Sequence, residues 1–372
     1  IVIFAGSMAA FIMSAHLAIA WVFIEATTLA STYLIYYSGT KNSLEASWKY
    51  IFICSIGISL AFIGIVFLSL ATGNNGTLFY SDMLQNAAAI DGFWLKIAFV
   101  FILTGFGTKA GLAPVHAWLP DAHSEAPSPV SAMLSGALLN TAMLGILRVF
   151  KVMKIAGYEV FASVLILAMG FLSLAIAAVF VIKAKNYKRM MAYSSIENMG
   201  IIAIGAALGG FGAIAALIHT FSHSLLKSAF FMTAGNILKI YHTKIISKSS
   251  GLLRKSPVLG WLFIVLFAAL SAVPPSPSFI SEYMIAAEMF KRGGIFIPAA
   301  VVFLLLIVFV VYGMGKTVFF MAYGKDESPE ENVRLPFMLY VPVILLLAAA
   351  TGAAVIMPQF LIDIFKNAID FM

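Results

Sequence analysis

Five ionisable residues lie within long apolar runs of the sequence and could carry protons: Glu25, Lys109, His223, Lys227 and Glu282. A charge inside a membrane-spanning segment is costly unless it faces a cavity or a partner, so each is a functional candidate. Carboxylate, amine and imidazole groups can all exchange protons near neutral pH once burial has shifted their titration. Their order along the chain predicts a proton relay.

The spacing of these residues adds two expectations. His219, His223 and Lys227 follow one another at intervals of four, which places them on one face of a helix. His219 could belong to the relay or form a hydrogen bond between helices. Glu25 and Lys109 could form a coupled pair that switches, or a static ion pair that locks two helices.

A polar group follows Lys109 and contains His116, Asp121, His123 and Glu125. The spacing H-x4-D-x-H-x-E is not a recognised metal-ligand pattern, so we expect no metal there. We interpret these residues as fixing a loop and giving protons access. Glu197, beside the basic segment 183–189, is expected to be a solvated or capping charge near a membrane surface.

Composition sets the fold class. Of 372 residues, 62% are hydrophobic and 10% charged, with a mean hydropathy of +1.00. Soluble domains carry roughly a quarter of charged residues, so a soluble globular protein is excluded. The apolar residues form long runs without the alternation of a membrane barrel. The sequence predicts an all-α transmembrane helical bundle.

Apolar windows indicate about eleven helices, which lie at 1–15, 17–37, 49–71, 92–113, 128–150, 160–182, 190–209, 212–239, 258–289, 295–323 and 335–357. The fourth and the ninth are interrupted by prolines, at Pro114 and Pro120 and at Pro274 to Pro277. Broken helices in a bilayer are tolerated where they are buried in protein or line a water-filled cavity. Both breaks therefore mark candidate sites.

The two breaks occupy equivalent places in successive runs of five helices. This predicts two inverted repeats, residues 1–153 and 158–323, followed by a C-terminal helix and tail at 324–372. Lys and Arg concentrate in the loops at one end of the helices, which the positive-inside rule makes cytoplasmic. We expect a multi-pass membrane protein, and the charges by themselves leave the type of cell or organelle open.

Other chemistry is not expected within this chain. The single cysteine, Cys54, excludes disulfides and Cys-ligated iron–sulfur clusters, and the sequence contains no phosphate-binding loop for ATP. The net charge of +7 reflects the loops of a membrane protein rather than nucleic-acid binding. We expect no cofactor and no catalytic residue here.

The segment 107–148, GTKAGLAPVHAWLPDAHSEAPSPVSAMLSGALLNTAMLGILR, closely resembles the signature of a known family. These are the antiporter-like, proton-translocating subunits of respiratory complex I, Mrp-type sodium/proton antiporters and membrane-bound nickel–iron hydrogenases. YKRMMAYSSIENMG (187–200) resembles the family's next recurring segment. The resemblance covers nearly the whole chain. Because members have about fourteen helices, it implies helices four to fourteen here, with three more before Ile1.

The resemblance also implies roles, residue by residue. In order along the chain, the family's relay positions match Glu25 on the fifth helix, Lys109 on the broken seventh, His223, Lys227 one turn on, and Glu282 on the broken twelfth. Two departures stand out, because Asn140 replaces an eighth-helix lysine and Asn198 replaces a histidine. The path from Lys109 to His223 would then depend on waters held by Asn140, Ser135 or Thr141.

Segments 21–61 and 219–231 are most similar to the F component of the hydrogenase-four and formate hydrogenlyase branch. The sequence is therefore interpreted as a non-catalytic subunit that moves H⁺, or Na⁺, within an oxidoreductase complex. Its expected partners are other membrane subunits and a peripheral redox arm with iron–sulfur and nickel–iron centres. The alternatives are a complex I subunit, a cation/proton exchanger without redox partners, and a scaffold with static charges.

Overall fold

A computed structural model describes residues 1–73, 77–325, 333–356 and 359–369. Its α-helices are α1 (Val2–Met13), α2 (Leu17–Ile35), α3 (Lys41–Thr72), α4 (Tyr80–Gln85), α5 (Gly92–Ala110), α6 (Leu119–Glu125), α7 (Ser128–Met133), α8 (Leu139–Ile155), α9 (Glu159–Lys183), α10 (Tyr187–Leu208), α11 (Phe211–Tyr241), α12 (Leu252–Lys255), α13 (Pro257–Leu270), α14 (Pro277–Arg292), α15 (Phe296–Tyr323), α16 (Val341–Ile356) and α17 (Gln359–Ile369). The described residues contain no strand, only two isolated bridges.

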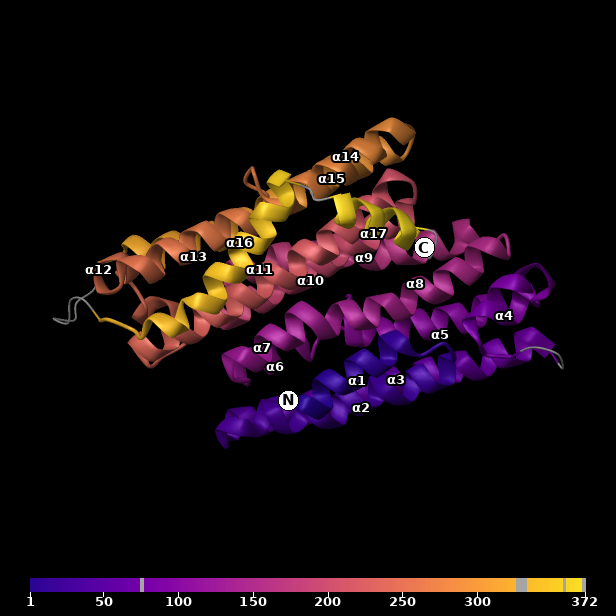
Figure 1. Ribbon diagram of the computed structural model, residues 1–372, viewed down its shortest axis with the longest axis horizontal. Helices are drawn as coiled ribbons and strands as arrows, with labels where there is room; N and C mark the ends of the chain where they lie inside the picture. The colour runs from indigo at the N-terminus through magenta and orange to yellow at the C-terminus, as the bar shows by residue number, and fades with distance from the viewer. Residues whose placement is uncertain (74–76, 326–332, 357–358, 370–372) are drawn as a thin grey trace.

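The long helices run roughly parallel, with α2, α3 and α5 along one side of the molecule and α13 to α15 along the other (Figure 1). The loops at one end carry most of the basic residues. We call this the basic end, and it contains α6, α12 and the segments 36–41, 183–189 and 242–256. The short helix α4 lies at the opposite end (Figure 1).

Eight helices in the described part of the chain are long and apolar enough to cross a membrane. The predicted all-α membrane bundle is confirmed, while the number of about eleven spans stays a prediction. One further helix, α11, has 31 residues and contains the predicted His219–His223–Lys227 face. The eleventh predicted window corresponds to α16, although its last residue, 357, lies outside the described residues.

Two helices begin earlier than their apolar windows, because polar caps set their first turns. The window at 49–71 covers α3 from its third turn onward. The helix itself begins at Lys41, after a capping box formed by Thr40 and Ser43. The window at 190–209 belongs to α10, where the Asn186 side chain accepts from the backbone N–H groups of Lys188 and Arg189. Hydropathy windows miss these polar first turns.

Both predicted interruptions are present. Helix α5 ends at Ala110, where Gly111 adopts a left-handed φ of +74°, and the chain resumes as α6 at Leu119. Helix α13 ends at Leu270 and α14 begins at Pro277, with the Ser276 side chain capping its first turn. The breaks contain the cis peptides Ala113–Pro114 and Pro274–Pro275. The division into two inverted five-helix repeats stays a prediction, and part of its 324–372 unit lies outside the described residues.

Small residues allow α3 and α5 to pack closely beside the first break. A Cβ added at Gly105 would lie 2.5 Å from the backbone nitrogen of Ala61 and 2.6 Å from the carbonyl oxygen of Gly57. Such small-residue contacts are a main source of helix association within membranes, where lipid removes the hydrophobic driving force. The glycine at 105 thus determines how near Lys109 comes to α3.

We expect Gly105→Leu to destabilise the protein by about 1–3 kcal/mol or more, because backbone atoms of α3 would have to move. The melting temperature of the detergent-solubilised protein measures this effect. Gly6→Leu is the control, since nothing lies within 4 Å of a Cβ at Gly6. Equal melting temperatures for the two variants would contradict the close packing.

Candidate functional site: two buried charge centres

The first centre surrounds Lys109, on the last turn of α5 before the break. The side chain is fully buried, and its Nζ donates to Thr28 Oγ1 at 2.8 Å and to Tyr50 OH at 2.6 Å. The ammonium also lies 4.7 Å from the centroid of the Tyr50 ring, within cation–π range. Helices α2 and α3 thus supply the groups that replace water around this amine.

Glu25 completes the first centre without touching the lysine. Its Oε1 accepts from Ser55 Oγ at 2.7 Å, and its Oε2 accepts from Thr28 Oγ1 at 3.3 Å. No ion pair joins Glu25 to Lys109, so the direct pair allowed by the sequence is corrected to a bridged one. The Thr28 hydroxyl accepts from the amine and donates to the carboxylate, which provides a hydrogen-bonded link between the two charges.

The second centre surrounds Lys227, on α11. This side chain is also fully buried, and its Nζ donates to the backbone oxygen of Met191 on α10 at 3.0 Å. Glu197, two turns further along α10, interacts electrostatically with Lys227 and accepts a hydrogen bond from Ser194 Oγ at 3.2 Å. Each centre therefore combines a buried lysine with a carboxylate.

The expectation that Glu197 is a solvated or capping charge is wrong. Only 6% of this residue is exposed, because every residue of α10 from Ser194 to Leu208 is buried. The basic segment 183–189 before it suggested proximity to water. However, Glu197 lies ten residues into the helix that begins at Tyr187, about 15 Å along its axis.

The two histidines on α11 differ in their surroundings. His219 bonds through Nδ1 to Ser281 Oγ at 2.8 Å and through Nε2 to Asn198 Oδ1 at 3.0 Å, and so joins α10, α11 and α14. Both ring nitrogens of His223 are buried without a hydrogen-bond partner. His219 thus has the helix-linking contacts that one alternative predicted, whereas His223 has unused capacity for a proton or a water.

Glu282 lies on α14, in the second turn after the second break, and is 8% exposed. It interacts electrostatically with Glu197. Next to it along α14, Ser281 contacts His219, and Ser278 shares a 2.7 Å hydrogen bond with Ser222. The second break therefore places a carboxylate beside the Glu197–Lys227 centre.

A row of rings leads from one centre toward the other. The Tyr50 ring lies 5.0 Å from Trp118, Trp118 lies 6.4 Å from His123, and His123 lies 4.9 Å from Phe231. Trp118 and His123 belong to α6 and the turn before it, whereas Phe231 lies one turn after Lys227 on α11. The segment after the first break is thus packed between the two centres.

Asn140 replaces the lysine that the family resemblance would place on this helix. It follows a π-helical turn, Leu134–Leu138, and its Nδ2 donates to Ser224 Oγ at 2.7 Å while its Oδ1 is buried without a partner. In the same π turn, Ser135 shares a 2.8 Å hydrogen bond with Ser195 of α10. Both side chains join neighbouring helices, and Thr141 bonds to its own helix at Ala137.

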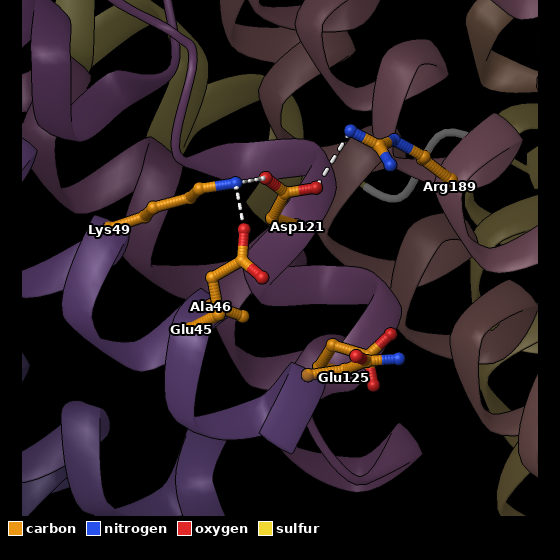
Figure 2. Close-up of a pocket in the computed structure, with 7 residues that line it drawn as sticks. Glu45, Ala46, Lys49, Asp121, Glu125 and Arg189 are labelled. Atoms are coloured by element: carbon orange, nitrogen blue, oxygen red, sulfur yellow. Dashed lines mark hydrogen bonds and ion pairs between the residues drawn. The ribbon is translucent and has the colours of Figure 1, made fainter. Parts of the chain in front are cut away.

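The other polar residues after Lys109 lie at the basic end. Asp121 accepts from Arg189 at 2.7 Å and from Lys49 at 3.2 Å, which ties α6 to α10 and to α3 (Figure 2). Glu125 pairs with Lys244 at 2.9 Å. His116 is half-buried, and burial lowers its pKa. The expected loop-fixing role suits Asp121, which bridges both sides of the bundle.

Both ring nitrogens of His123 are buried without a hydrogen-bond partner. It is fully buried, and burial, reinforced by the charges of Lys188 and Lys227, lowers its pKa to about 3. Among the described residues, no group of three His, Cys, Asp or Glu side chains could hold a metal ion.

Sequence reasoning missed three buried polar residues: Thr28 and Tyr50 of the first centre, and Lys188 at the start of α10. Thr28 and Tyr50 are uncharged, and only their contacts with Lys109 reveal them. Lys188 resembled a loop lysine but is 1% exposed. The sequence does contain a sign of this burial. Lys188 lies three and four residues before Met191 and Ala192, so a helix that begins at Tyr187 places all three on one buried face.

Comparison with known proteins identifies the family to which this chain belongs. The profile of the family described as "NADH:quinone oxidoreductase/Mrp antiporter, TM" matches residues 14–356. The chain belongs to this antiporter family. The resemblance noted in the sequence is therefore confirmed.

Relatives within the antiporter family include hydrogenase components. The chain is 37% identical over 364 residues to the Hydrogenase-4 component F homolog of Methylacidiphilum infernorum, covering 95% of this chain and 74% of that protein. It is 28% identical over 369 residues to Hydrogenase-4 component B of Escherichia coli, covering 93% of this chain and 54% of that protein. It thus spans about half to three quarters of these relatives.

A solved structure has the same fold. A chain of the membrane-bound sulfane sulfur reductase, an archaeal respiratory membrane complex, superposes with a TM-score of 0.90 at 25% identity. The match covers 99% of this chain and 74% of that one. The helical bundle is therefore that of antiporter-family subunits in multisubunit membrane complexes.

We expect Thr28→Val to lower stability by about 1–3 kcal/mol, because the Lys109 amine and the Glu25 carboxylate each lose a hydrogen-bond partner. Thr28→Ser keeps the hydroxyl and should retain most of the melting temperature. Thr32→Val is the matched control, since Thr32 Oγ1 bonds only to the Thr28 carbonyl oxygen of its own helix. A Thr28→Val protein as stable as this control would show that the bridge is unimportant.

The low pKa of His123 predicts a pH dependence of stability. A histidine whose folded pKa of about 3 lies below its ordinary 6.5 costs nothing above pH 6.5 and destabilises the fold progressively as the pH falls toward 3. The slope is about 1.4 kcal/mol per pH unit for this group. Thermal denaturation from pH 7 to pH 4 should therefore be less pH-dependent for His123→Phe. His242→Asn, at an exposed left-handed position, is the control and should follow the wild type.

Proposed function

We propose that this chain is the proton-translocating membrane subunit of a hydrogenase-type redox complex, working through Glu25, Lys109, His223, Lys227 and Glu282. The observation that carries the proposal is the presence of two fully buried lysines, each beside a carboxylate, in one bundle. If these lysines only formed ion pairs that hold helices together, their amines would not need to be fully buried. Burying charge is costly, and membrane proteins retain it where it moves protons or ions.

The first centre acts as a switch. While Lys109 is protonated, its ammonium and the Glu25 carboxylate stabilise each other through Thr28. A charge change that partner subunits impose near Glu25 weakens this interaction and favours release of the Lys109 proton. Interacting sites of this kind titrate together, so a change at one propagates to its neighbour.

The second centre completes the transfer. Loss of the positive charge at Lys109 changes the electrostatic potential at α11, from which Lys109 is separated by the row of rings Tyr50, Trp118, His123 and Phe231. Lys227 and Glu197 can then exchange their proton, with His223 as the neighbouring acceptor because its ring nitrogens have no other partner. Glu282, next to Glu197, exchanges the proton with the far side of the membrane. Asn140 and His219 orient the helices around this path.

The proposal includes sidedness and partners. The basic end faces the cytoplasm of a prokaryotic cell, as the positive-inside rule requires. Electron transfer takes place in a peripheral arm with iron–sulfur and nickel–iron centres, carried by partner subunits. Names of the relatives support this assignment, because two of them are components of hydrogenase-4. The transported ion is H⁺, since the buried groups are amines, imidazoles and separate carboxylates rather than an oxygen cage for Na⁺.

The test is redox-driven proton uptake in vesicles that contain the whole complex. We expect Lys109→Met and Glu282→Gln to lower the uptake rate by about 10²-fold, the usual contribution of a positioned proton-transfer group. Lys248→Met, which alters an exposed lysine, should pump as the wild type does. Assembly and electron transfer are measured in parallel.

Normal pumping by both assembled variants would overturn the proposal and leave the buried charges with a structural role. Sodium uptake that persists after the redox partners are removed would instead identify a cation/proton exchanger.

A further inference from the structure

Lys188 is a buried charge that the proposed relay does not use. It lies in the first turn of α10 at the basic end, yet only 1% of it is exposed. Its Nζ donates to the backbone oxygen of Ala126 at 2.5 Å, and Ala126 is the C-cap residue of α6. The Glu125 carboxylate interacts with it electrostatically but accepts a hydrogen bond from Lys244. Lys188 thus lacks a dedicated counter-ion.

A water-accessible cavity is lined by Glu125 and by Arg189, the residue after Lys188. It has a volume of about 210 Å³ and is lined by Asn42, Glu45, Ala46, Lys49, Asp121, Glu125 and Arg189 (Figure 2). A water molecule occupies about 30 Å³ in the liquid, so several fit. Three carboxylates face this space, and Glu125 is the one that also interacts with Lys188.

His123 lies on the inner side of Lys188. Its ring is fully buried, with neither nitrogen hydrogen-bonded, and it interacts electrostatically with Lys188 on α10 and with Lys227 and His223 on α11. His123 therefore interacts with two buried lysines from different helices. Its free nitrogens can accept a proton on one side of the ring and release one on the other.

Like charges make this order directional. Lys188, His123 and Lys227 would repel one another if all were protonated, because their interactions are poorly screened inside the protein. A proton can therefore move inward from Lys188 only after Lys227 has lost its own. Such an order opposes entry of a second proton from the basic end while Lys227 is still charged.

We propose that Lys188 is the inlet residue through which protons pass from the Glu125 cavity to His123 and Lys227. In the first step Glu125, protonated on the oxygen that Lys244 does not contact, gives its proton to neutral Lys188. A Glu125 O–H bond breaks, an N–H bond forms, the carboxylate takes a new proton from water in the cavity, and no electron is transferred. Burial keeps His123 neutral at rest, so it carries the proton only transiently: one ring nitrogen accepts from the Lys188 ammonium while the other gives a proton to neutral Lys227. The inference rests on the proposed function and specifies how its second centre is reloaded.

The experiment uses inside-out vesicles with the intact complex, so that the basic end faces the medium. The initial rate of redox-driven proton uptake from the medium is measured for Lys188→Met, Lys188→Arg and Lys188→His. Arginine keeps the charge and the donor to Ala126 but cannot give up its proton, whereas histidine can. Lys185→Met, at an exposed lysine just before α10, is the control.

We expect Lys188→Met and Lys188→Arg to slow uptake by about 10²-fold and Lys188→His to retain part of the rate. A residue that only anchors α6 would give the opposite order, with arginine working and histidine failing. That result, or normal uptake by assembled Lys188→Met, would overturn the inlet. If a Lys188 variant fails to assemble, Glu125→Gln is measured, and it must slow uptake while leaving electron transfer intact.

Lys227→Met separates the two proposals. If Lys227→Met abolishes pumping but Lys188→Arg pumps normally, the inlet is wrong and the proposed function stands. If Lys227→Met, Lys109→Met and Glu282→Gln all pump normally, the proposed function itself is wrong.

Discussion

An ammonium group inside a membrane must be solvated by the protein, and the structure around both centres follows from that requirement. Lys109 takes its hydrogen-bond acceptors from α2 and α3, and Lys227 takes one from the backbone of α10. These acceptors hold the helices in register, because moving one would leave a buried charge without partners. The same contacts keep the amines apart from their carboxylates, so neither lysine is held in a fixed ion pair.

The first helix break, directly after Lys109, contributes to the surroundings of both buried amines. Ending α5 at Ala110 frees the following residues to turn, and it lets α6 lie between the two halves of the bundle. There Asp121 contacts both α3 and α10, while Trp118 and His123 pack toward Tyr50 and Phe231. A short helix anchored on both sides can transmit a change at Lys109 to α10 and α11.

Much of this arrangement follows from the sequence, because a charge in an apolar run is conspicuous. Lys109, Lys227 and Glu282 were recognisable as buried from their surroundings alone, and all three are buried. The expectation for Glu197 is wrong and Lys188 goes unnoticed, because a nearby basic loop indicates water where α10 is covered by its neighbours. Hydropathy describes a segment's average environment, whereas the exposure of a side chain depends on which helices surround it.

Hydropathy, proline positions and a long signature are local properties of the chain, so the helical membrane fold, the two proline breaks and the family can be predicted from the amino-acid sequence. The position of Thr28 between Glu25 and Lys109, and the burial of Lys188, become visible only when the helices are packed together. These contacts join residues far apart in the chain through uncharged or loop-like side chains. Helix packing brings them together, and no pattern within a single segment encodes it.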